Sequence, residues 1–416
     1  MRKTAVVYTD ITELHPVHDC VAALDVHLNQ ITVCVMLREP DGQVRMQFRE
    51  FGGFKRDRRE MAEWIASFQP QAVSMESTGI YWKSPYAALE RVGIRAQVVN
   101  AAEVAKTPGR KTDMLDAQWL ALLTRAGLLR GSFLPVEKLR HARQLARYHT
   151  SLVNDLVRQK NRLLKVLADG GMRLSAIVSD PHGKACRAMI DAILDGATPE
   201  QAVRHAGRLR APHAELRAAL DHELTEVHLN LARQIRQYIT FIEASMSDIE
   251  AALMQEVLPQ GSLIAQLLTL PGIDRLAAAK LLVEIGDDMS HFAKPGRMAV
   301  WTGVCPGNEE SAGNRKRAKT RKGNCHARRV LIEIAHAAVK TQCYFKDKFQ
   351  SLKPRLGYKR AIVAIAHKII KVIYCMLSRG ELYRDRSVDF EALQTRRNAP
   401  RWIRQLQKHG VLSANA

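Results

Sequence analysis

The sequence predicts an α/β domain at the N-terminus, followed by a long and mainly helical remainder. Over the first 130 residues, short runs with the two-residue period of strands alternate with runs of helical spacing. Beyond them, apolar residues recur every three or four positions through most of the chain. The charge divides in the same way: of a net +21, residues 261–416 carry +17, with 29 Lys+Arg against 12 Asp+Glu. A chain of 416 residues is long enough for two or three domains.

The pattern over the first 130 residues predicts three strands followed by alternating helices and strands. Strands are expected at 21–26, 31–37 and 44–51, with a turn at Pro40-Asp41-Gly42. After them come a helix at 54–68, a strand at 72–76, a helix through 86–92, a strand at 95–99 and a helix at 113–126. This is the element order of an RNase H-like domain, a mixed sheet with helices on its faces.

Residues 131–260 form a predicted helical spacer. Between 224 and 257 the apolar positions follow an 11-residue repeat, which predicts a nearly straight or slightly right-handed coil; they are Leu224, Val227, Leu231, Ile235, Tyr238, Ile242, Met246, Ile249, Leu253 and Val257. A matching helix is expected at 145–167, with a face formed by Leu145, Leu152, Leu156, Leu163 and Leu167. The two helices could form an intramolecular hairpin or a dimerising coiled coil. Residues 174–215 are expected to form a helical insertion between them.

The third predicted domain spans residues 261–384. Pro271-Gly272-Ile273 lies between two helical patterns, which is a helix–hairpin–helix signal. Such a turn can hold a phosphate at a helix N-terminus, or it can be a plain helical hairpin without DNA contact. Further helices are expected at 326–341 and 359–377. The tail, residues 385–416, is polar and basic, with the composition of a partly disordered segment.

Composition excludes several classes of protein. No apolar run approaches the ~20 residues of a membrane-spanning helix, and no secretory signal is visible, so a soluble, cytoplasmic protein is expected. The seven cysteines include no CxxC pair, which argues against a zinc ribbon or a disulfide framework and for reduced thiols. The clustered positive charge predicts a polyanionic partner. Nucleic acid is favoured over an acidic membrane because no basic amphipathic anchor or lipidation motif is present.

Four carboxylates are candidate metal ligands. Asp25 lies on the first predicted strand, Glu76 ends the fourth, and Asp113 and Asp116 open a helix three residues apart. On an RNase H-like sheet these side chains can converge, and carboxylate oxygens suit Mg²⁺. Two such ions stabilise the attacking and leaving oxygens of a phosphoryl transfer. Taken singly, Asp113 and Asp116 could instead be favourable charges at a helix N-terminus.

A second candidate site is the basic loop that contains Ser311. From Ser311 to Arg329 there are eight cationic residues and no acids; these residues are Arg315, Lys316, Arg317, Lys319, Arg321, Lys322, Arg328 and Arg329. They could position a phosphodiester and stabilise its added negative charge. A hydroxyl needs activation to act as a nucleophile, so Ser311 is either a nucleophile or a turn residue in a phosphate-binding loop. His27 and His326 lie near the two candidate sites and could act as general bases, although solvated or structural histidines are commoner.

These motifs resemble those of the bacterial insertion-sequence transposases that combine a DEDD catalytic tetrad with a C-terminal serine. These are the bridge-RNA-guided recombinases, to which the Piv DNA invertase is related. ALDVH, MESTGIYW and KTDMLDAQWLA resemble the RuvC-like half, while LLTLPGIDRLAAAKLL, GVCPG and ESAGNRKRAKTRKGN resemble the transposase half. The motifs occur in the family's order across a helical spacer, although residues 174–215 make that spacer longer than in compact members.

The resemblance implies specific roles for these residues. Asp25, Glu76, Asp113 and Asp116 would bind Mg²⁺, with Mn²⁺ as a substitute, and Ser311 would form a covalent phosphoserine link to DNA. A structured noncoding RNA would pair with donor and target DNA, and a homodimer or homotetramer would assemble each active site from two protomers. Two alternatives remain from the residues alone. One is a RuvC-like nuclease that uses water, with the C-terminal half only for binding; the other is a non-catalytic nucleic-acid-binding protein.

Overall fold

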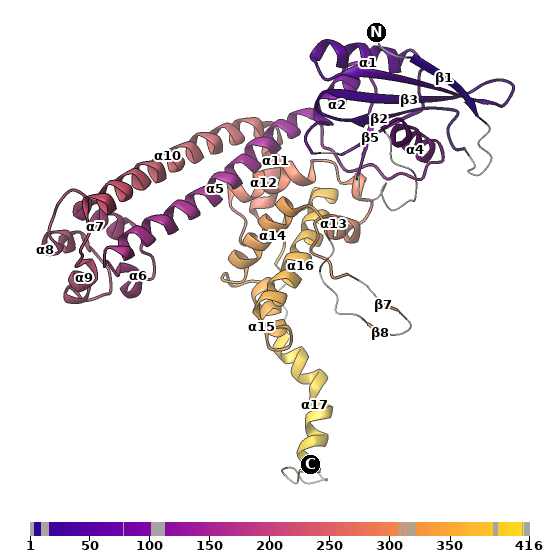
Figure 1. The fold of residues 1–416 in the computed structure, drawn as a ribbon. Helices are drawn as coiled ribbons and strands as arrows, with labels where there is room; N and C mark the ends of the chain where they lie inside the picture. The colour runs from indigo at the N-terminus through magenta and orange to yellow at the C-terminus, as the bar shows by residue number, and fades with distance from the viewer. Residues whose placement is uncertain are drawn as a thin grey trace. The chain divides into compact units, whose positions relative to one another are not determined.

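The computed structural model describes residues 4–9, 16–77, 79–100, 113–307, 310–311, 314–315, 320, 322–385, 390–409 and 411. For some of these residues the structure describes only the backbone; they are 4–9, 113–115, 310–311, 314–315, 390–391, 393–394 and 397. The chain forms two compact units, Met1–Leu134 and Pro135–Ala416 (Figure 1). The first is an α/β unit, and the described residues of the second form mainly helices, with one short hairpin.

The N-terminal unit contains a mixed six-stranded sheet. Its strands are β1 Thr4–Thr9, β2 Cys20–Val26, β3 Gln30–Arg38, β4 Val44–Gly52, β5 Ala72–Glu76 and β6 Gln97–Val99. Their order in the sheet is β1-β4-β3-β2-β5-β6. The pairs β1–β4, β4–β3 and β3–β2 are antiparallel, whereas β2–β5 and β5–β6 are parallel. The predicted three-strand meander and RNase H-like order are therefore confirmed. Strand β1, which the sequence patterns did not indicate, extends the edge beyond β4, and β6 is shorter than expected.

Helices cover both faces of this sheet. They are α1 Lys55–Ala66, α2 Lys83–Arg91 and α4 Asp113–Arg125. Alternate residues of β2 separate the faces: Ala22 and Leu24 pack with α1 and α2, whereas Val21 and Ala23 pack with α4. Figure 1 shows α1 and α2 on one side of the strands and α4 on the other.

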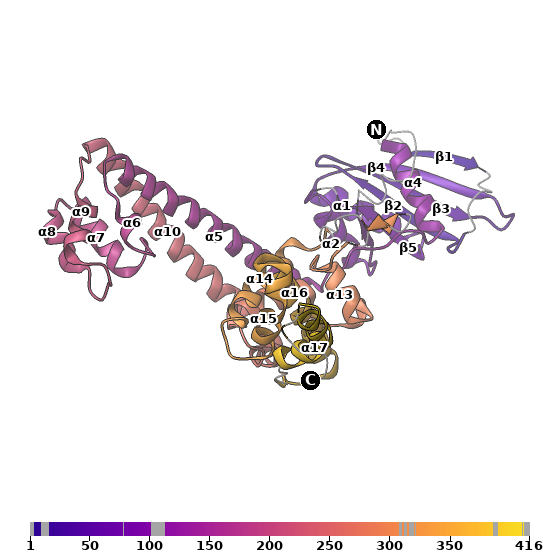
Figure 2. The ribbon, with the colours of Figure 1, turned by 90° about the horizontal axis from the view of Figure 1, so that it is seen from below.

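The helical unit is built on two long helices, α5 Glu137–Asp169 and α10 Glu226–Glu256. They run side by side through most of their length (Figure 2). Of the two arrangements left open by the sequence, the intramolecular hairpin is therefore present. Leu152, Leu163 and Leu167 are buried on α5, as expected.

The predicted 11-residue repeat on α10 is wrong. Val227, Leu231 and Tyr238 are each about half exposed or more. The spacing between successive inward-facing residues alternates between three and four, which gives a seven-residue repeat. These residues are Ala232, Ile235, Ile239, Ile242, Met246, Ile249 and Leu253. Residue type and helix face disagree at two positions of this helix, because Ala232 is small but buried and Tyr238 is large but half exposed.

The insertion between the two arms is helical, as predicted. It contains α6 Leu174–Ile177, α7 Lys184–Leu194, α8 Pro199–Ala202, the 3₁₀ turn η1 Val203–His205 and α9 His213–Leu220. Its apolar residues share one core with the C-terminal end of α5, including Leu163 and Leu167, and with the first half of α10, including Ala232 and Ile239.

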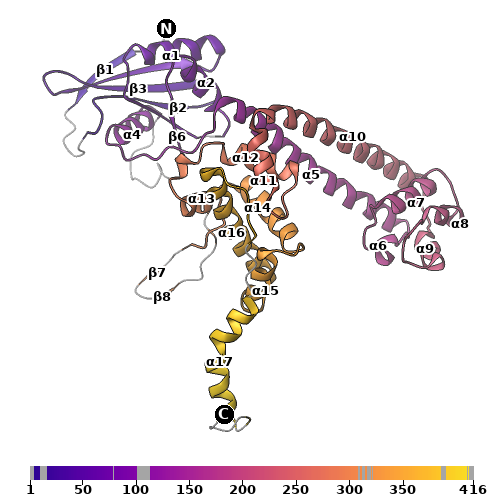
Figure 3. The ribbon, with the colours of Figure 1, turned by 180° about the vertical axis from the view of Figure 1, so that it is seen from behind.

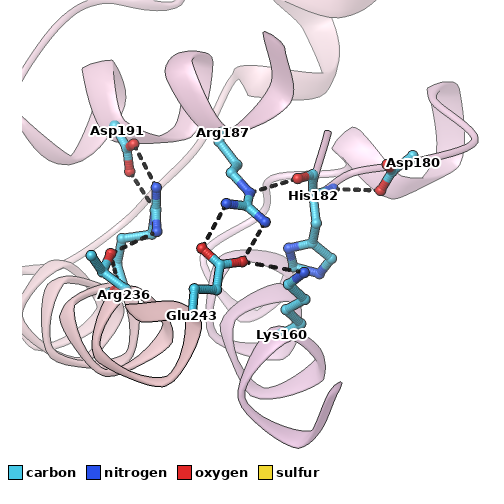
Figure 4. A network of polar contacts seen from close by, with 8 residues as sticks. Lys160, Asp180, His182, Arg187, Asp191, Arg236 and Glu243 are labelled. Carbon is cyan, nitrogen blue, oxygen red and sulfur yellow. Dashed lines mark hydrogen bonds and ion pairs between the residues drawn. The ribbon is translucent and has the colours of Figure 1, made fainter. Parts of the chain in front are cut away.

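Ion pairs also hold α7 against the long helices (Figure 4). Arg187 donates two hydrogen bonds to Glu243 at 2.9 and 2.6 Å, and Arg236 donates to both carboxylate oxygens of Asp191 at 2.8 and 3.0 Å. Lys160 of α5 lies 3.6 Å from Glu243. Burial opposes ionisation of Glu243, but the Arg187 hydrogen bonds and the two cations outweigh it and lower its pKa. The insertion is therefore fixed on the helix pair by both packing and charge.

The rest of the helical unit consists of helices and 3₁₀ turns that follow α10 in the sequence. The elements are η2 Leu258–Gln260, α11 Gly261–Leu268, α12 Arg275–Ile285, η3 Ser290–Phe292, α13 Pro295–Trp301, α14 Cys325–Ala338, α15 Tyr344–Leu356, α16 Tyr358–Arg379 and α17 Phe390–Lys408. Figure 3 shows α16 beside α13, α14 and α15. Helix α15 was not predicted, and the tail expected to be partly disordered contains α17.

Helix α16 corrects the expectation that no segment could span a membrane. Its 22 residues are long and apolar enough to cross one by length and composition alone, a test that buried core helices also pass. Its inward face includes Ile362, Ile369 and Ile373, and it packs against α11, α13, α14 and α15. Packing inside the helical unit accounts for its apolar composition.

The predicted helix–hairpin–helix element is present as α11 and α12. Gly272 has φ +85°, and a Cβ there would lie 2.4 Å from the backbone nitrogen of Ala338 in α14. Asp274 caps α12 by accepting a hydrogen bond from the Ala277 backbone at 2.7 Å. The turn thus packs on α14, and a carboxylate already occupies the helix N-terminus. Both observations favour the plain helical hairpin over a phosphate site.

Buried His149 makes the stability of the helical unit depend on pH. Its Nδ1 lies 2.9 Å from Nζ of Lys280, and burial together with that cation lowers its pKa to about 4. Folding therefore favours the neutral imidazole, so this contribution is fully present above pH ~6.5 and is lost as the pH falls towards 4. We expect the free energy of unfolding to be roughly 2–3 kcal/mol lower at pH 4.5 than at pH 7 from this group alone.

Denaturant titrations of the wild type and His149→Gln at both pH values test this expectation. Glutamine can still accept a hydrogen bond from Lys280 but does not titrate, so the variant should lose less stability on acidification. An equal loss in both proteins would assign the pH dependence to other groups, such as His326 and His367, whose pKa values are also lowered by burial.

Candidate functional site

The sheet places two of the four candidate acids on one face. Strands β2 and β5 are parallel, with Leu24 opposite Met75, so Asp25 and Glu76 are the next residues along the two strands. Leu24 and Met75 pack with α1 and α2. Because side chains alternate along a strand, Asp25 and Glu76 point to the opposite face, which α4 covers.

Helix α4 carries the other two acids. Asp113 is its first residue, and Asp116 is exposed one turn later. Ala117 and Leu120 of this helix pack on the same face as Val21 and Ala23 of β2. The side chain of Asp113 lies outside the described residues, so the structure does not test whether all four carboxylates meet.

Asp25 is largely buried, with 9% of its surface exposed. Its Oδ2 lies 3.1 Å from Nε2 of His27, whose ring is half exposed. No group of three or more Asp, Glu, His or Cys side chains close enough to hold a metal occurs among those that the structure describes. The chemistry of the donors nevertheless fits a hard cation: neighbouring strand carboxylates provide the oxygen ligands that Mg²⁺ prefers.

Ser311 lies in the loop between α13 and α14, on a small hairpin. Strands β7 Glu310–Ser311 and β8 Asn314–Arg315 pair antiparallel, with Ser311 opposite Asn314, so two residues connect them. A bridge between Pro306 and Thr320 pairs the two sides of the loop nearer its base. The backbone position of Ser311 is therefore next to the turn of a paired hairpin.

The structure describes only part of the basic segment. Lys316, Arg317, Lys319 and Arg321 lie outside the described residues, and only the backbone of Arg315 is included. Lys322 is exposed. Arg328 and Arg329 are half-buried on α14, and Arg329 donates hydrogen bonds to Glu333 at 3.1 Å and to Asn154 of α5 at 2.8 Å. Arg329 thus has a structural role that the sequence did not indicate.

A buried ion-pair cluster around Glu284 supports the base of this loop. Glu284 of α12 is 1% exposed, and its two carboxylate oxygens accept hydrogen bonds from Nε and Nη2 of Arg147, at 2.7 and 2.9 Å. Arg143 donates to the backbone oxygens of Val283 and Glu284. Burial opposes ionisation of Glu284, but the Arg147 hydrogen bonds and the Arg143 charge outweigh it and lower its pKa. The cluster joins α5 to α12.

Asn324 links the same cluster to the end of the serine loop. Its side-chain nitrogen donates to Glu284 at 2.7 Å, and its side-chain oxygen accepts from the backbone of His326 and Ala327, which caps α14. Its own backbone nitrogen donates to the Trp301 oxygen at 2.8 Å. A Cβ at Gly323 would lie 2.4 Å from the backbone nitrogen of Gly303, so only glycine fits between the two ends of the loop.

Four residues of this cluster were not among the predicted site residues: Glu284, Asn324, Arg143 and Arg147. Asn324 precedes a helical pattern, which is an available N-cap signal. Glu284 directly follows the apolar run Leu281–Val283 of α12, which is the pattern of a buried charge that needs a partner. Its partners are about 40 and 140 residues away in the sequence, and no local pattern indicates them.

Comparison with known proteins finds similarity to transposases in both parts of the chain. Residues 22–170 match the transposase family model DEDD_Tnp_IS110, and residues 264–350 match that of the IS116/IS110/IS902 transposase family. A transposase for insertion sequence element IS1111A from Coxiella burnetii is 30% identical over 28% of this chain. A putative transposase, y4qE, from Sinorhizobium fredii is 26% identical over 71% of it. The matched stretches cover 33% and 66% of those two relatives, respectively.

Proposed function

We propose that this chain is a member of the IS110/IS116/IS902 family of transposases, and that it is the transposase of an insertion sequence, which cuts and rejoins DNA by transesterification. The observation that carries the proposal is the sheet register. It brings Asp25 and Glu76 to neighbouring positions on the face covered by the helix that begins at Asp113. The separate family match around Ser311 supports a second functional part in the helical unit.

The acids are assigned to metal binding. Asp25, Glu76, Asp113 and Asp116 would hold Mg²⁺, or Mn²⁺ in its place. When bound, the metal neutralises the charge on a phosphodiester and stabilises the leaving oxygen. The backbone of Asp25 is held by strand β2 within the sheet, so this carboxylate is already positioned beside Glu76. His27, within 3.1 Å of Asp25, orients that carboxylate or accepts a proton.

Ser311 is assigned as the nucleophile. Its Oγ would attack the phosphorus, form a phosphoserine bond to one DNA strand and release the other end as a free hydroxyl, while the serine proton passes to a base. Attack of a DNA hydroxyl on the phosphoserine would then rejoin the strand and regenerate Ser311, so no external energy source is needed. The cationic residues between Arg315 and Arg329 would bind the DNA and offset the added negative charge.

Guidance and assembly complete the proposal and rest on the family resemblance. A structured noncoding RNA would select donor and target DNA by base pairing, and Ser311 of one protomer would meet the acids of another in a homodimer or homotetramer. Sequencing the RNA that co-purifies with the full chain tests guidance. Recovery of one structured RNA that pairs with the element ends would support it, and RNA of random cellular origin would contradict it.

The catalytic acids are tested by Asp25→Asn. We expect strand cleavage of a DNA carrying the element ends to fall ~100-fold or more, because a metal ligand contributes several kcal/mol to the transition state. Chelation of Mg²⁺ should have the same effect on the wild type. Asp41→Asn is the matched control, since it removes a carboxylate from an exposed turn of the same unit. Full cleavage by Asp25→Asn, or cleavage without a divalent metal, would contradict the assignment.

A further inference from the structure

A basic groove lies between α1 and α2 of the N-terminal unit. It has a volume of about 540 Å³ and its lining includes four cationic side chains and one carboxylate; the lining residues are Lys55, Arg58, Arg59, Ala62, Glu63, Ala88, Arg91 and Val92. Buried Ala62 and Ala88 leave space between the two helices because their side chains are small. The carboxylate, Glu63, already accepts a hydrogen bond from Arg59 at 2.9 Å. The lining is therefore strongly positive in a unit whose overall charge is close to neutral.

The cations come from both helices and are partly held in place. Arg58 is half-buried and donates to the backbone oxygen of Gly53, while Glu63 orients Arg59. Lys55 is the first residue of α1 and Arg91 the last of α2, and both are exposed. Arg58 is therefore partly ordered and loses less conformational entropy when a ligand binds, whereas Lys55, Arg59 and Arg91 are exposed.

The groove lies on the other face of the sheet from the candidate acids. Helices α1 and α2 pack on the face formed by Ala22 and Leu24, whereas Asp25 points to the face covered by α4. A DNA strand at Asp25 does not fill the groove, which is thus a separate surface. The rings of Phe51, Trp64 and Phe68 pack on one another, and the exposed ring of Phe54 directly precedes Lys55 in the chain. The residues that line the groove include no aromatic side chain, so the lining presents charge rather than rings for base stacking.

We propose that this groove binds the phosphodiester backbone of a nucleic-acid segment distinct from the strand that is cut. Guanidinium and ammonium groups on two helices suit phosphate oxygens, and the absence of stacking rings among the lining residues predicts binding without base preference. The groove thus holds a nucleic acid on the N-terminal unit while the acid face remains open. This role does not depend on Ser311 or on strand cleavage.

The test compares two double variants of the full chain. Lys55→Gln/Arg91→Gln removes two groove cations, whereas Arg56→Gln/Lys83→Gln removes two exposed cations from the same helices outside the groove lining. Affinities are measured by fluorescence anisotropy against a structured RNA, a single-stranded DNA and a duplex DNA over a range of salt concentrations. Thermal unfolding confirms that both variants remain folded.

We expect the groove variant to bind at least one probe ~10-fold more weakly at low salt. Its slope of log affinity against log salt should become shallower by about 2 for a duplex, or slightly less for a single strand, because two phosphate contacts are lost. The control variant should keep the wild-type slope. The probe that loses affinity identifies the occupant as RNA or DNA. An unchanged slope with all three probes, or an equal change in the control, would overturn the proposal.

Discussion

Replacing Ser311 with alanine is expected to abolish the covalent protein–DNA adduct while leaving nucleic-acid binding intact. The variant lacks the only oxygen that the side chain could place on phosphorus, so strand exchange should fall by about 1000-fold or more. Binding should persist because the cations after residue 311 are unchanged. Adducts are measured by denaturing electrophoresis of a labelled DNA substrate after incubation with Mg²⁺, and binding is measured by mobility shift.

Ser262→Ala is the matched control for this experiment, since it removes an exposed serine hydroxyl from α11 of the same unit. It should form adducts at the wild-type level. Persistent adducts in Ser311→Ala would show that another side chain is the nucleophile. Cleavage by the wild type without any protein-linked strand would instead favour the RuvC-like nuclease that uses water. Both of these outcomes would contradict the proposed cleavage mechanism only. The proposal that the groove between α1 and α2 binds nucleic acid is tested separately, by the binding measurements on the groove variant.

Removal of the Glu284 carboxylate has the largest expected effect on stability. Glu284→Ala leaves Arg143 and Arg147 without their buried anion and removes the acceptor of the Asn324 amide. Breaking a buried ion pair from one side typically costs about 3–5 kcal/mol, because the remaining charge stays away from water. We expect the free energy of unfolding, measured by denaturant titration, to fall by that amount.

Glu333→Ala provides the contrasting control. Glu333 is exposed on α14 and pairs with Arg329 four residues earlier, at 3.1 Å. Exposed pairs of this kind contribute about 0–1 kcal/mol, so this variant should remain close to the wild type. If both variants lost the same stability, the buried position of Glu284 would not be what makes it important. A loss in Glu284→Ala below about 1 kcal/mol would contradict the ion-pair account directly.

Local patterns were sufficient for most of the N-terminal unit. The meander, the strand at 72–76 and the helix from Asp113 all follow from alternation and helical spacing, and the structure confirms them. They also predicted that Asp25 and Glu76 belong together, since both residues lie near the ends of strands in one sheet. Strand β1 was missed because it pairs at the sheet edge with β4, a contact about 40 residues away along the chain.

By itself, the sequence determined most elements of the N-terminal unit, the acidic and basic segments and the presence of the two long helices. These depend on residue type at short range. Only the tertiary structure decided which face of α10 is buried, how Glu284 and Asn324 support the serine loop, and that cations of α1 and α2 line one groove. The physical reason is that burial and charge pairing depend on neighbours brought together by folding. Tyr238 occupies an apolar position of a helical repeat but is exposed, and Glu284 is charged but buried. The local sequence pattern does not distinguish such residues from buried tyrosines and exposed glutamates.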